Sequence, residues 1–388
     1  MNPRLFQRPI KIAVSLCFCL LVLSGCWDRR EINDMALVLA VGLDYKSANR
    51  INLSVEFAIP ESMGGGQMET SGNNGPSTMV EQSQGQTISD AIARLQEKVS
   101  RQIFWGHNHI IIIGEKMAKH GIQHTVDFFS RHPDSRLHAF VYASKGNAAD
   151  LLTITPALEQ NPANFIRELT KLKLGVTVTI KDLLEELGGD TKSIAIPRIE
   201  QSTASDDQNK TVLRENGSAI LNHGKMVGYI DDKATRGVLI LRNEIEKSTI
   251  TFHPPGTDHS ISFNQIRTHT TLIPEWSDGE FRMKVNVEAY EDVVENDTPL
   301  NLMDIRTTKM LEDQLSQVVK SRIDQACRDV QRGMKTDVFG FGEAFHRAYP
   351  KQWTKVKSHW NEVFSKTPVS VHAHVKIRRS GMTSNSPE

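Results

Sequence analysis

The chain of 388 residues is short of three things that would define its class at once: cysteine, an excess of one charge, and long apolar segments. Four cysteines are too few for a disulfide scaffold of this length. Lysine plus arginine (46) equals aspartate plus glutamate (46), so nothing indicates a basic surface that binds nucleic acid. A mean hydropathy of −0.36 excludes a protein that crosses the membrane many times. The remaining composition is that of a globular protein, and its length predicts two or three domains.

The amino-terminus departs from this average composition. Residues 1 to 11 contain three basic side chains and no acidic one, and residues 12 to 23 are apolar except for Ser15. Twelve helical residues span about 18 Å, whereas the hydrocarbon core of a bilayer is roughly 30 Å thick. The segment is therefore predicted to be an export signal and not a permanent membrane span.

The residues that follow this segment, Leu23-Ser24-Gly25-Cys26, resemble the lipobox of bacterial lipoproteins. The resemblance implies cleavage before Cys26, an S-diacylglycerol group on its thiol and an N-acyl group on the new amine. Two acyl chains hold a protein on a membrane stably, because each buried methylene contributes about 0.8 kcal/mol. Residues 1–25 are thus expected to be a signal peptide, and the mature protein to be anchored without spanning the membrane.

Removal of the signal peptide changes both the cysteine content and the charge. Two cysteines leave with it and Cys26 carries lipid, so only Cys327 remains and an intramolecular disulfide is impossible. Cys327 lies on the apolar stripe of an expected helix, which favours a small buried hydrophobe over a nucleophile. The mature chain keeps 43 basic and 46 acidic residues, a net charge of −3. Overall basic charge therefore does not explain membrane attachment.

The periodicity of apolar residues predicts a mixed α/β chain of the α+β class, with mixed sheets and packed helices in two to three domains. A glycine- and glutamine-rich stretch at 61–86 is expected to be a loop. In the first half, strands are expected at 36–45, 51–59, 110–113, 137–143 and 193–199, and helices at 88–99, 115–131, 164–174 and 180–187.

A uniformly polar segment at 201–210 is the predicted linker between two domains. It separates an expected N-terminal α/β domain at 26–200 from an expected C-terminal α+β domain at 211–388. The C-terminal part is expected to open with strands, to continue with a helix from 311 to 330 that Gly333 ends, and to close with a strand at 369–377.

Histidines are the most conspicuous candidates for chemistry. Six of the fourteen lie within 32 residues, and two more lie near the end of the chain on one side of the last expected strand; they are His107, His109, His120, His124, His132, His138, His372 and His374. His120 and His124 would share one side of a helix, as metal ligands do. No glutamate lies between them to act as a general base, because Gly121 follows His120 directly. Surface histidines or histidines with ordinary hydrogen bonds are therefore favoured over a metal site.

Other signatures of catalysis are absent from the sequence. There is no Gly-x-Ser-x-Gly elbow and no Gly-x-Gly-x-x-Gly after a strand. The acids Glu185, Glu186 and Asp190 are interpreted as a solvated helix face. The aromatic residues of 339–364 are interpreted as core and not as an exposed docking patch. By elimination the sequence predicts a binding or assembly protein with no catalytic, cofactor or metal residues.

Family-like segments extend over the mature chain, beginning with the lipid-site opening Gly25-Cys26-Trp27-Asp28-Arg29-Arg30-Glu31-Ile32-Asn33-Asp34. The others are Gly42-Leu43-Asp44, Phe104-Trp105-Gly106-His107, Ile111 to Glu115, Asp127 to Arg131, Arg236-Gly237, Asp337 to Gly342, Trp353, Trp360 and Val375 to Gly381. Together they resemble the Ger(x)C family of germination lipoproteins, the C subunit of bacterial spore germinant receptors.

The resemblance implies a non-enzymatic subunit required for germination in response to nutrients, anchored on the outer face of the spore inner membrane. It also implies a three-domain α/β architecture, which agrees with the two expected domains if the C-terminal one divides near 300. Its partners would be the A and B membrane subunits of the receptor, with membrane lipid held through Cys26. Whether the subunit contacts the nutrient is left open. The alternatives are a lipid-anchored solute-binding protein of a transporter and, from the histidines alone, a tethered metallohydrolase.

Overall fold

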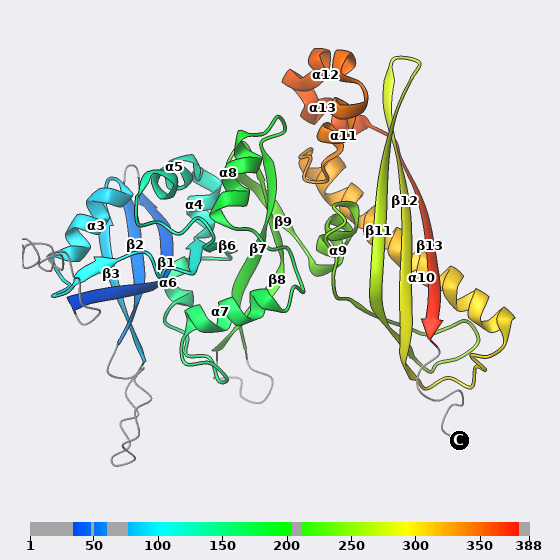
Figure 1. Ribbon diagram of the computed structural model, residues 1–388, viewed down its shortest axis with the longest axis horizontal. Coiled ribbons are helices and arrows are strands. Elements are labelled where there is room, and N and C mark those ends of the chain that lie inside the picture. The colour runs from blue at the N-terminus through cyan, green and yellow to red at the C-terminus, as the bar shows by residue number, and fades with distance from the viewer. Residues whose placement is uncertain (1–33, 48–49, 60–76, 204–210, 380–388) are drawn as a thin grey trace, which may run out of the picture.

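The computed structural model describes residues 34–47, 50–59, 77–203 and 211–379 and contains two β-sheets that lie side by side along its long axis (Figure 1). Helices pack on both sheets, so the α+β class with mixed sheets is confirmed. The expected signal peptide and Cys26 lie outside the described residues.

The first sheet contains nine strands in the order β3-β2-β1-β5-β6-β7-β8-β9, and β4 pairs with the start of β1. Strands β1, β5, β6 and β7 run parallel to their neighbours in that group, and the flanking pairs are antiparallel. Parallel strands are covered on both faces, which is why Ile110–Ile113 is buried along its whole length. The bounds are β1 Met35–Ser47, β2 Arg50–Ala58, β3 Thr78–Gly85, β4 Gln102–Phe104, β5 Ile110–Ile113, β6 Phe140–Ser144, β7 Ser193–Thr203, β8 Thr211–Asn222 and β9 Lys225–Ile230.

Helices cover both faces of this sheet. Leu95, Met117 and Leu183 belong to the apolar cluster on one face, and Ala148 and Ile166 to the cluster on the other. The first face carries α3 Ile88–Gln96, α4 Glu115–His120, α5 Gln123–Arg131 and α8 Ile180–Gly188, and the second carries α6 Ala148–Leu151 and α7 Pro162–Lys171.

Two expectations for this region are wrong in detail. The expected loop at 61–86 contains strand β3, whose residues 78–85 pair with β2; residues 60–76 lie outside the described part. The expected helix at 115–131 is divided into α4 and α5, because Gly121 has a φ of +131° that a continuous helix excludes.

The predicted linker at 201–210 joins two neighbouring strands of one sheet. Strands β7 and β8 pair from Ser193↔Asn222 to Thr203↔Thr211, so residues 204–210, which are not described, connect adjacent strand ends. A polar composition is typical of hairpin loops as well as of linkers. The nine-stranded sheet therefore continues to the end of β9, beyond the expected boundary.

The second sheet has the order β10-β11-β12-β13, and only β12 and β13 are parallel. Its inner face follows the alternation of β12, in which Met283, Val285 and Val287 are buried beneath a long helix, α10. Because β13 returns to pair with β12, residues after 300 rejoin the same sheet. The bounds are β10 Thr249–Phe252, β11 Ile261–Ser277, β12 Glu280–Asn296, α10 Ile305–Ala326 and β13 Val369–Arg379.

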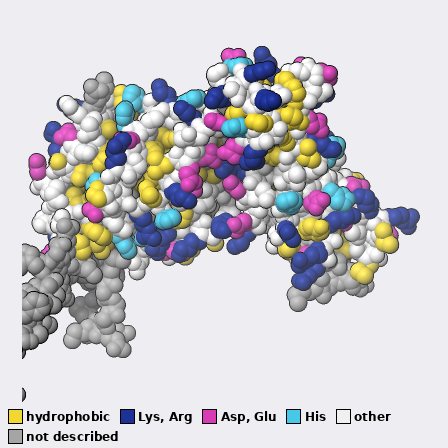
Figure 2. Space-filling model, turned by 45° about the horizontal axis from the view of Figure 1, so that its top comes forward, with side chains coloured by type: hydrophobic (Ala, Val, Ile, Leu, Met, Phe, Trp, Pro, Cys, Tyr) yellow, Lys and Arg dark blue, Asp and Glu magenta, His cyan; other side chains and the backbone are white. Residues whose placement is uncertain are grey.

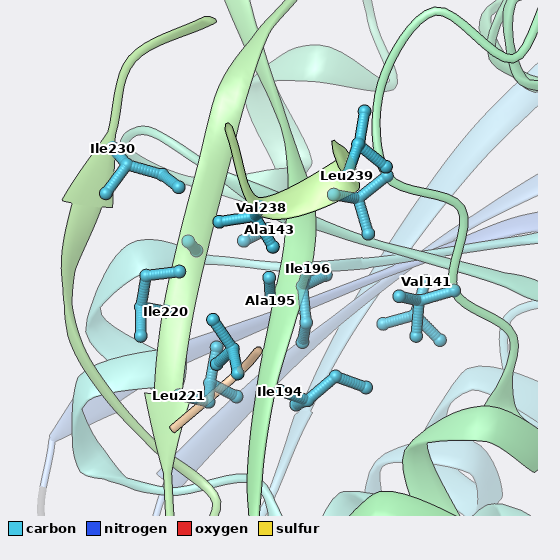
Figure 3. Close-up of a cluster of buried hydrophobic side chains, with 14 of the residues drawn as sticks. Val141, Ala143, Ile194, Ala195, Ile196, Ile220, Leu221, Ile230, Val238 and Leu239 are labelled. Carbon is cyan, nitrogen blue, oxygen red and sulfur yellow. The ribbon is translucent and has the colours of Figure 1, made fainter. Parts of the chain in front are cut away.

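Helix α9 (Asp232–Leu241) lies between the two sheets (Figure 1). On one side Val238 and Leu239 approach apolar side chains of β6 to β9, among them Ile196 and Ile220 (Figure 3). On the other side α9 crosses α10 so closely that a Cβ at Gly237 would lie 2.2 Å from the carbonyl oxygen of Arg322. Both sheets consequently share one continuous apolar cluster.

The remaining helices form a cap around a buried carboxylate. Asp337 is 2% exposed and accepts hydrogen bonds from the backbone N–H groups of Phe339, Phe341 and Gly342 and from Nε1 of Trp360, at 2.6 to 3.2 Å. The aromatic residues around it are buried, so their interpretation as core is confirmed. The segments are a π-helical turn Cys327–Met334, α11 Phe341–Ala348, α12 Pro350–Val356, a 3-10 turn Lys357–His359 and α13 Trp360–Lys366.

Candidate functional site

A cavity of about 700 Å³ opens on the first sheet's helical face, at the ends of β1, β2, α3 and α4 and along α5. We call it the α3–α5 groove and define it by six of its lining residues: Tyr45, Arg50, Ile88, Met117, His120 and Phe128. Its floor is apolar, since Ile88 and Met117 are each only 4% exposed. Cavities that bind small molecules have volumes of roughly 300 to 1,000 Å³, so this one is large enough.

Local sequence signals explain why helix ends meet at the groove. Helix α3 begins after Thr87, whose Oγ1 accepts the N–H of Asp90 at 3.1 Å. Helix α4 stops at His120 because Gly121 turns the chain into α5. The rings of His120 and Tyr45 consequently stack, with centroids 4.2 Å apart and planes inclined by 24°.

Charges around the groove are predominantly positive. Arg131 and Asp127 form an ion pair at 2.8 Å, four residues apart on α5. Arg50 makes no ion pair with any described residue, although it lines the groove and is exposed. His124 and His132 also line the groove, and their imidazoles add N–H donors.

The predicted histidine cluster does not come together at one place. His120, His124 and His132 line the groove, whereas His107 and His109 form a separate ring pair with centroids 4.7 Å apart. The expectation that His120 and His124 share one helix is wrong, because they lie on α4 and α5. Among the described residues, no three His, Cys, Asp or Glu side chains are grouped closely enough to hold a metal ion.

The His107 and His109 pair lies in a basic environment. Burial, followed by the charge of Arg136 and Arg167, lowers the pKa of His107, and burial with His107 and these cations lowers the pKa of His109 to about 4. Arg136 donates to Nδ1 of His109 at 3.3 Å, which requires a neutral imidazole with its proton on Nε2. Both rings are therefore uncharged near neutral pH.

The other predicted candidates have structural surroundings. Cys327 is 5% exposed and burial raises the pKa of its thiol to about 12, which confirms a buried apolar role. His372 and His374 are exposed on β13, opposite Asn286 and Glu288 of β12. Cys26 lies outside the described residues.

Of the three acids interpreted as a solvated helix face, Glu185 and Asp190 are exposed, although Asp190 lies beyond the end of α8, and Glu186 is half-buried. Glu186 pairs with Arg242 at 3.2 Å, and the carboxylate of Asp190 accepts from Nε1 of Trp353 at 3.0 Å. These contacts join α8 and its following turn to the part of the chain that carries the second sheet. Figure 2 shows acidic side chains gathered near the middle of its visible face, with Lys or Arg beside them.

Sequence reasoning also missed the buried carboxylates that order the backbone. Asp44, at the end of the Gly42-Leu43-Asp44 segment, accepts the N–H groups of Ala148 and Ala149 at 2.8 and 3.0 Å. A Cβ at Gly114 would lie 1.9 Å from Oδ1 of Asp44, so only glycine fits there. The sequence signal for this role was the position of Asp44, a single acidic residue directly after an apolar run.

Comparisons with known proteins agree along the chain. The family model "Spore germination protein N-terminal domain" matches residues 28–201, and "Spore germination B3/ GerAC like, C-terminal" matches residues 216–381. The chain is 28% identical to spore germination protein KC of Bacillus subtilis, with 97% of both chains covered, and 23% identical to spore germination protein B3 of that organism, with 94% of this chain and 96% of the relative covered.

A solved structure shares the fold. The crystal structure of the GerBC protein superimposes with a TM-score of 0.60 at 18% identity, covering 87% of this chain and 96% of that one. No helix among the described residues is both long and apolar enough to span a bilayer.

Proposed function

Because the chain belongs to the Ger(x)C family of spore germination proteins, we propose that it is the C subunit of a nutrient germinant receptor. The observation that carries the proposal is that both family models match, in order, from residue 28 to residue 381. Relatives that align over nearly their whole lengths are spore germination proteins, which supports the same role.

In this proposal the subunit is not an enzyme and acts through contacts with the A and B membrane subunits. The surroundings of the candidate catalytic groups support this. Cys327 is a buried thiol with a raised pKa, and burial and neighbouring cations lower the pKa values of His107 and His109. The charged groups at the junction of the two sheets, Glu186 and Arg242, neutralise one another.

We further propose that Cys26 is lipidated and holds the mature chain on the outer face of the spore inner membrane. Eight peptide steps separate Cys26 from Asp34, the first described residue, and at about 3.4 Å each they allow a reach of roughly 27 Å. In this proposal the start of β1 therefore lies no farther than that from the anchored residue. Residues 1–25 act as the signal peptide.

The solute-binding alternative receives no support from the architecture. Binding lipoproteins of transporters commonly use two similar lobes around a cleft. Here one sheet has nine strands in mixed orientation and the other has four, and the apolar cluster around α9 is continuous between them. A hinge motion that opened a cleft between the two sheets would disrupt this shared core.

The anchor is tested by Cys26→Ala in spores, with Cys17→Ala as the matched control within the signal segment. We expect the Cys26 variant to leave the membrane fraction and to germinate poorly with nutrient, whereas the control remains membrane-bound and functional. Membrane attachment and normal germination of the Cys26 variant would refute the anchoring proposal.

The receptor role needs a separate test. A tagged chain should be recovered from spore membranes together with two membrane subunits, and deletion of its gene should abolish germination with one class of nutrient while spores still form. Recovery of the chain without membrane partners, with an unchanged nutrient response of the deletion strain, would refute the receptor role.

A further inference from the structure

The α3–α5 groove is not accounted for by a role in protein contacts or by the lipid anchor. It combines an apolar floor with polar groups along its rim, and its volume of about 700 Å³ is twice that of the cavity beside Arg242 (about 350 Å³). Ligand cavities in proteins have this make-up, with an apolar lining and a few polar groups that fix orientation.

The first clue to the occupant is the shape of the lining. The stacked Tyr45 and His120 rings form one flat wall, and Phe128 and His132, with centroids 5.3 Å apart and planes inclined by 44°, add a second aromatic surface. Aromatic faces gain about 0.5 to 1.5 kcal/mol from a properly placed second ring, beyond the burial of its area. Such walls favour a planar ring system over a flexible chain.

The second clue is charge. Among the described residues that line the groove, Asp127 is the single acidic side chain, and Arg131 already pairs with it at 2.8 Å. Arg50 has no ion-pair partner among the described residues and therefore supplies one uncompensated positive charge. A guanidinium binds a carboxylate through two parallel hydrogen bonds, and imidazole N–H groups from His120 and His124 lie on the same rim.

From these observations we propose that the α3–α5 groove is a binding site for a small organic anion with a flat, apolar ring system. The ring lies between the walls of Tyr45 with His120 and of Phe128, above the buried Ile88 and Met117. The anionic group faces Arg50. This inference is independent of the lipid anchor and of the receptor partners, so its failure would leave the proposed function intact.

The test uses the full chain in detergent micelles, with protein-free micelles as the blank, and isothermal titration calorimetry. The probe is 1-naphthoate, which is flat and carries one carboxylate. Two matched probes separate the two clues: 1-naphthamide keeps the rings without the charge, and decahydro-1-naphthoate keeps the charge and carbon skeleton without flatness. We expect saturable binding of one 1-naphthoate per chain, at least fivefold tighter than either matched probe.

Two exposed positions locate the binding. Arg50→Gln removes the free cation and should weaken 1-naphthoate binding about tenfold. His120→Ala removes one stacking ring and should weaken it about three- to tenfold. Arg94→Gln, at an exposed position of α3 that pairs with Asp90 and does not line the groove, is the matched control and should change binding less than twofold.

Several results would each overturn the proposal. These are the absence of saturable binding, equal binding of all three probes, and binding by Arg50→Gln and His120→Ala that equals that of the control. Because Arg50 and His120 are exposed, both variants should remain folded, which a cooperative urea transition verifies. Loss of binding by Arg94→Gln to the same extent would also overturn it, since the site would then not be the groove.

Discussion

Buried carboxylates in this protein differ in their effect on stability, according to whether hydrogen-bond donors surround them. Asp44 and Asp337 are surrounded by N–H groups and so order the chain around them. Glu291 of β12 is fully buried, and neither of its carboxylate oxygens has a hydrogen-bond partner in the described part of the chain. Satisfied and unsatisfied carboxylates should therefore respond differently to substitution.

Asp337→Ala should lower the free energy of unfolding by about 3 to 5 kcal/mol, because three backbone N–H groups and the Trp360 indole lose their acceptor in a buried place. Urea unfolding followed by tryptophan fluorescence measures this. The exposed Asp258→Ala serves as the control and should change stability by less than about 0.5 kcal/mol. A similar small change for Asp337→Ala would contradict its ordering role.

Glu291 should make stability depend on pH. Burial raises the pKa of its carboxyl to about 8, although nearby Arg322 opposes the shift. Since this value lies above the ordinary value of 4.5, Glu291 contributes stability as the neutral acid below about pH 4.5, and that contribution is lost as pH rises to about 8.

Glu291→Gln, which is neutral at every pH, should thus be more stable than the unaltered chain at pH 8 by a few kcal/mol. The difference should shrink toward pH 5. The comparison must use both proteins at each pH, because Glu56 and Glu215, with pKa values raised by burial to about 7, act in the same window. A stability difference that does not vary with pH would show that Glu291 is ionised throughout.

Helices and strands were predictable from the sequence where apolar residues recur at the spacing of that element. The alternation of β2 and β13 and the spacing in α3, α8 and α10 all indicate the elements that form. Strand β3 was missed because its sequence, Met79 to Gln84, is largely polar, as an edge strand permits. The pairing of β7 with β8, which the polar residues 204–210 separate in sequence, depends on contacts that composition does not encode.

The candidate site was less predictable than the fold. The spacing of the histidines in sequence did not predict how they are arranged in space, because the break at Gly121 places His124 on a different helix from His120. Arg50 lines the groove because the start of β2 lies beside the start of α3. These two elements are far apart in sequence, so their proximity is not visible in the sequence pattern. Cavities between elements depend on packing, which a pattern of apolar residues does not specify.

Strand β13 lies at the edge of its sheet, and side chains of helix α10 accept hydrogen bonds from some of its free backbone N–H groups. The N–H of Val375 donates to Oγ of Ser316 at 3.1 Å, and the N–H of Ile377 donates to Oε1 of Glu312 at 3.2 Å. Lys376 also pairs with Glu312 at 3.0 Å. These side chains occupy donors that could otherwise pair with another chain.

Glu312→Ala should therefore increase self-association, because the N–H of Ile377 is left free at an edge strand. Light scattering at rising protein concentration is the measurement. Asp313→Ala, one residue along α10 and exposed in a pair with Lys309, is the matched control and should stay monodisperse. Equal scattering by both variants would show that the edge is protected by other means.

At the scale of the whole molecule, the two sheets should unfold together. Helix α9 packs against both, and Arg242 at its end bonds Glu186 and the carbonyl oxygen of Val338. A continuous core of this kind favours one cooperative transition. Urea unfolding monitored by far-ultraviolet circular dichroism and by tryptophan fluorescence should give the same midpoint. Two separated transitions would show that the sheets are independent folding units.

The β7–β8 hairpin also constrains how this gene can recombine with genes for related subunits. The two family models meet near residues 201 to 216, which suggests a natural crossover point, yet the strands on either side pair with one another. A crossover there would build one sheet from two different sequences. The side chains of β7 and β8 that pack together would then come from proteins in which they were not selected to fit one another. Genes of this family should therefore be inherited and exchanged as whole coding sequences.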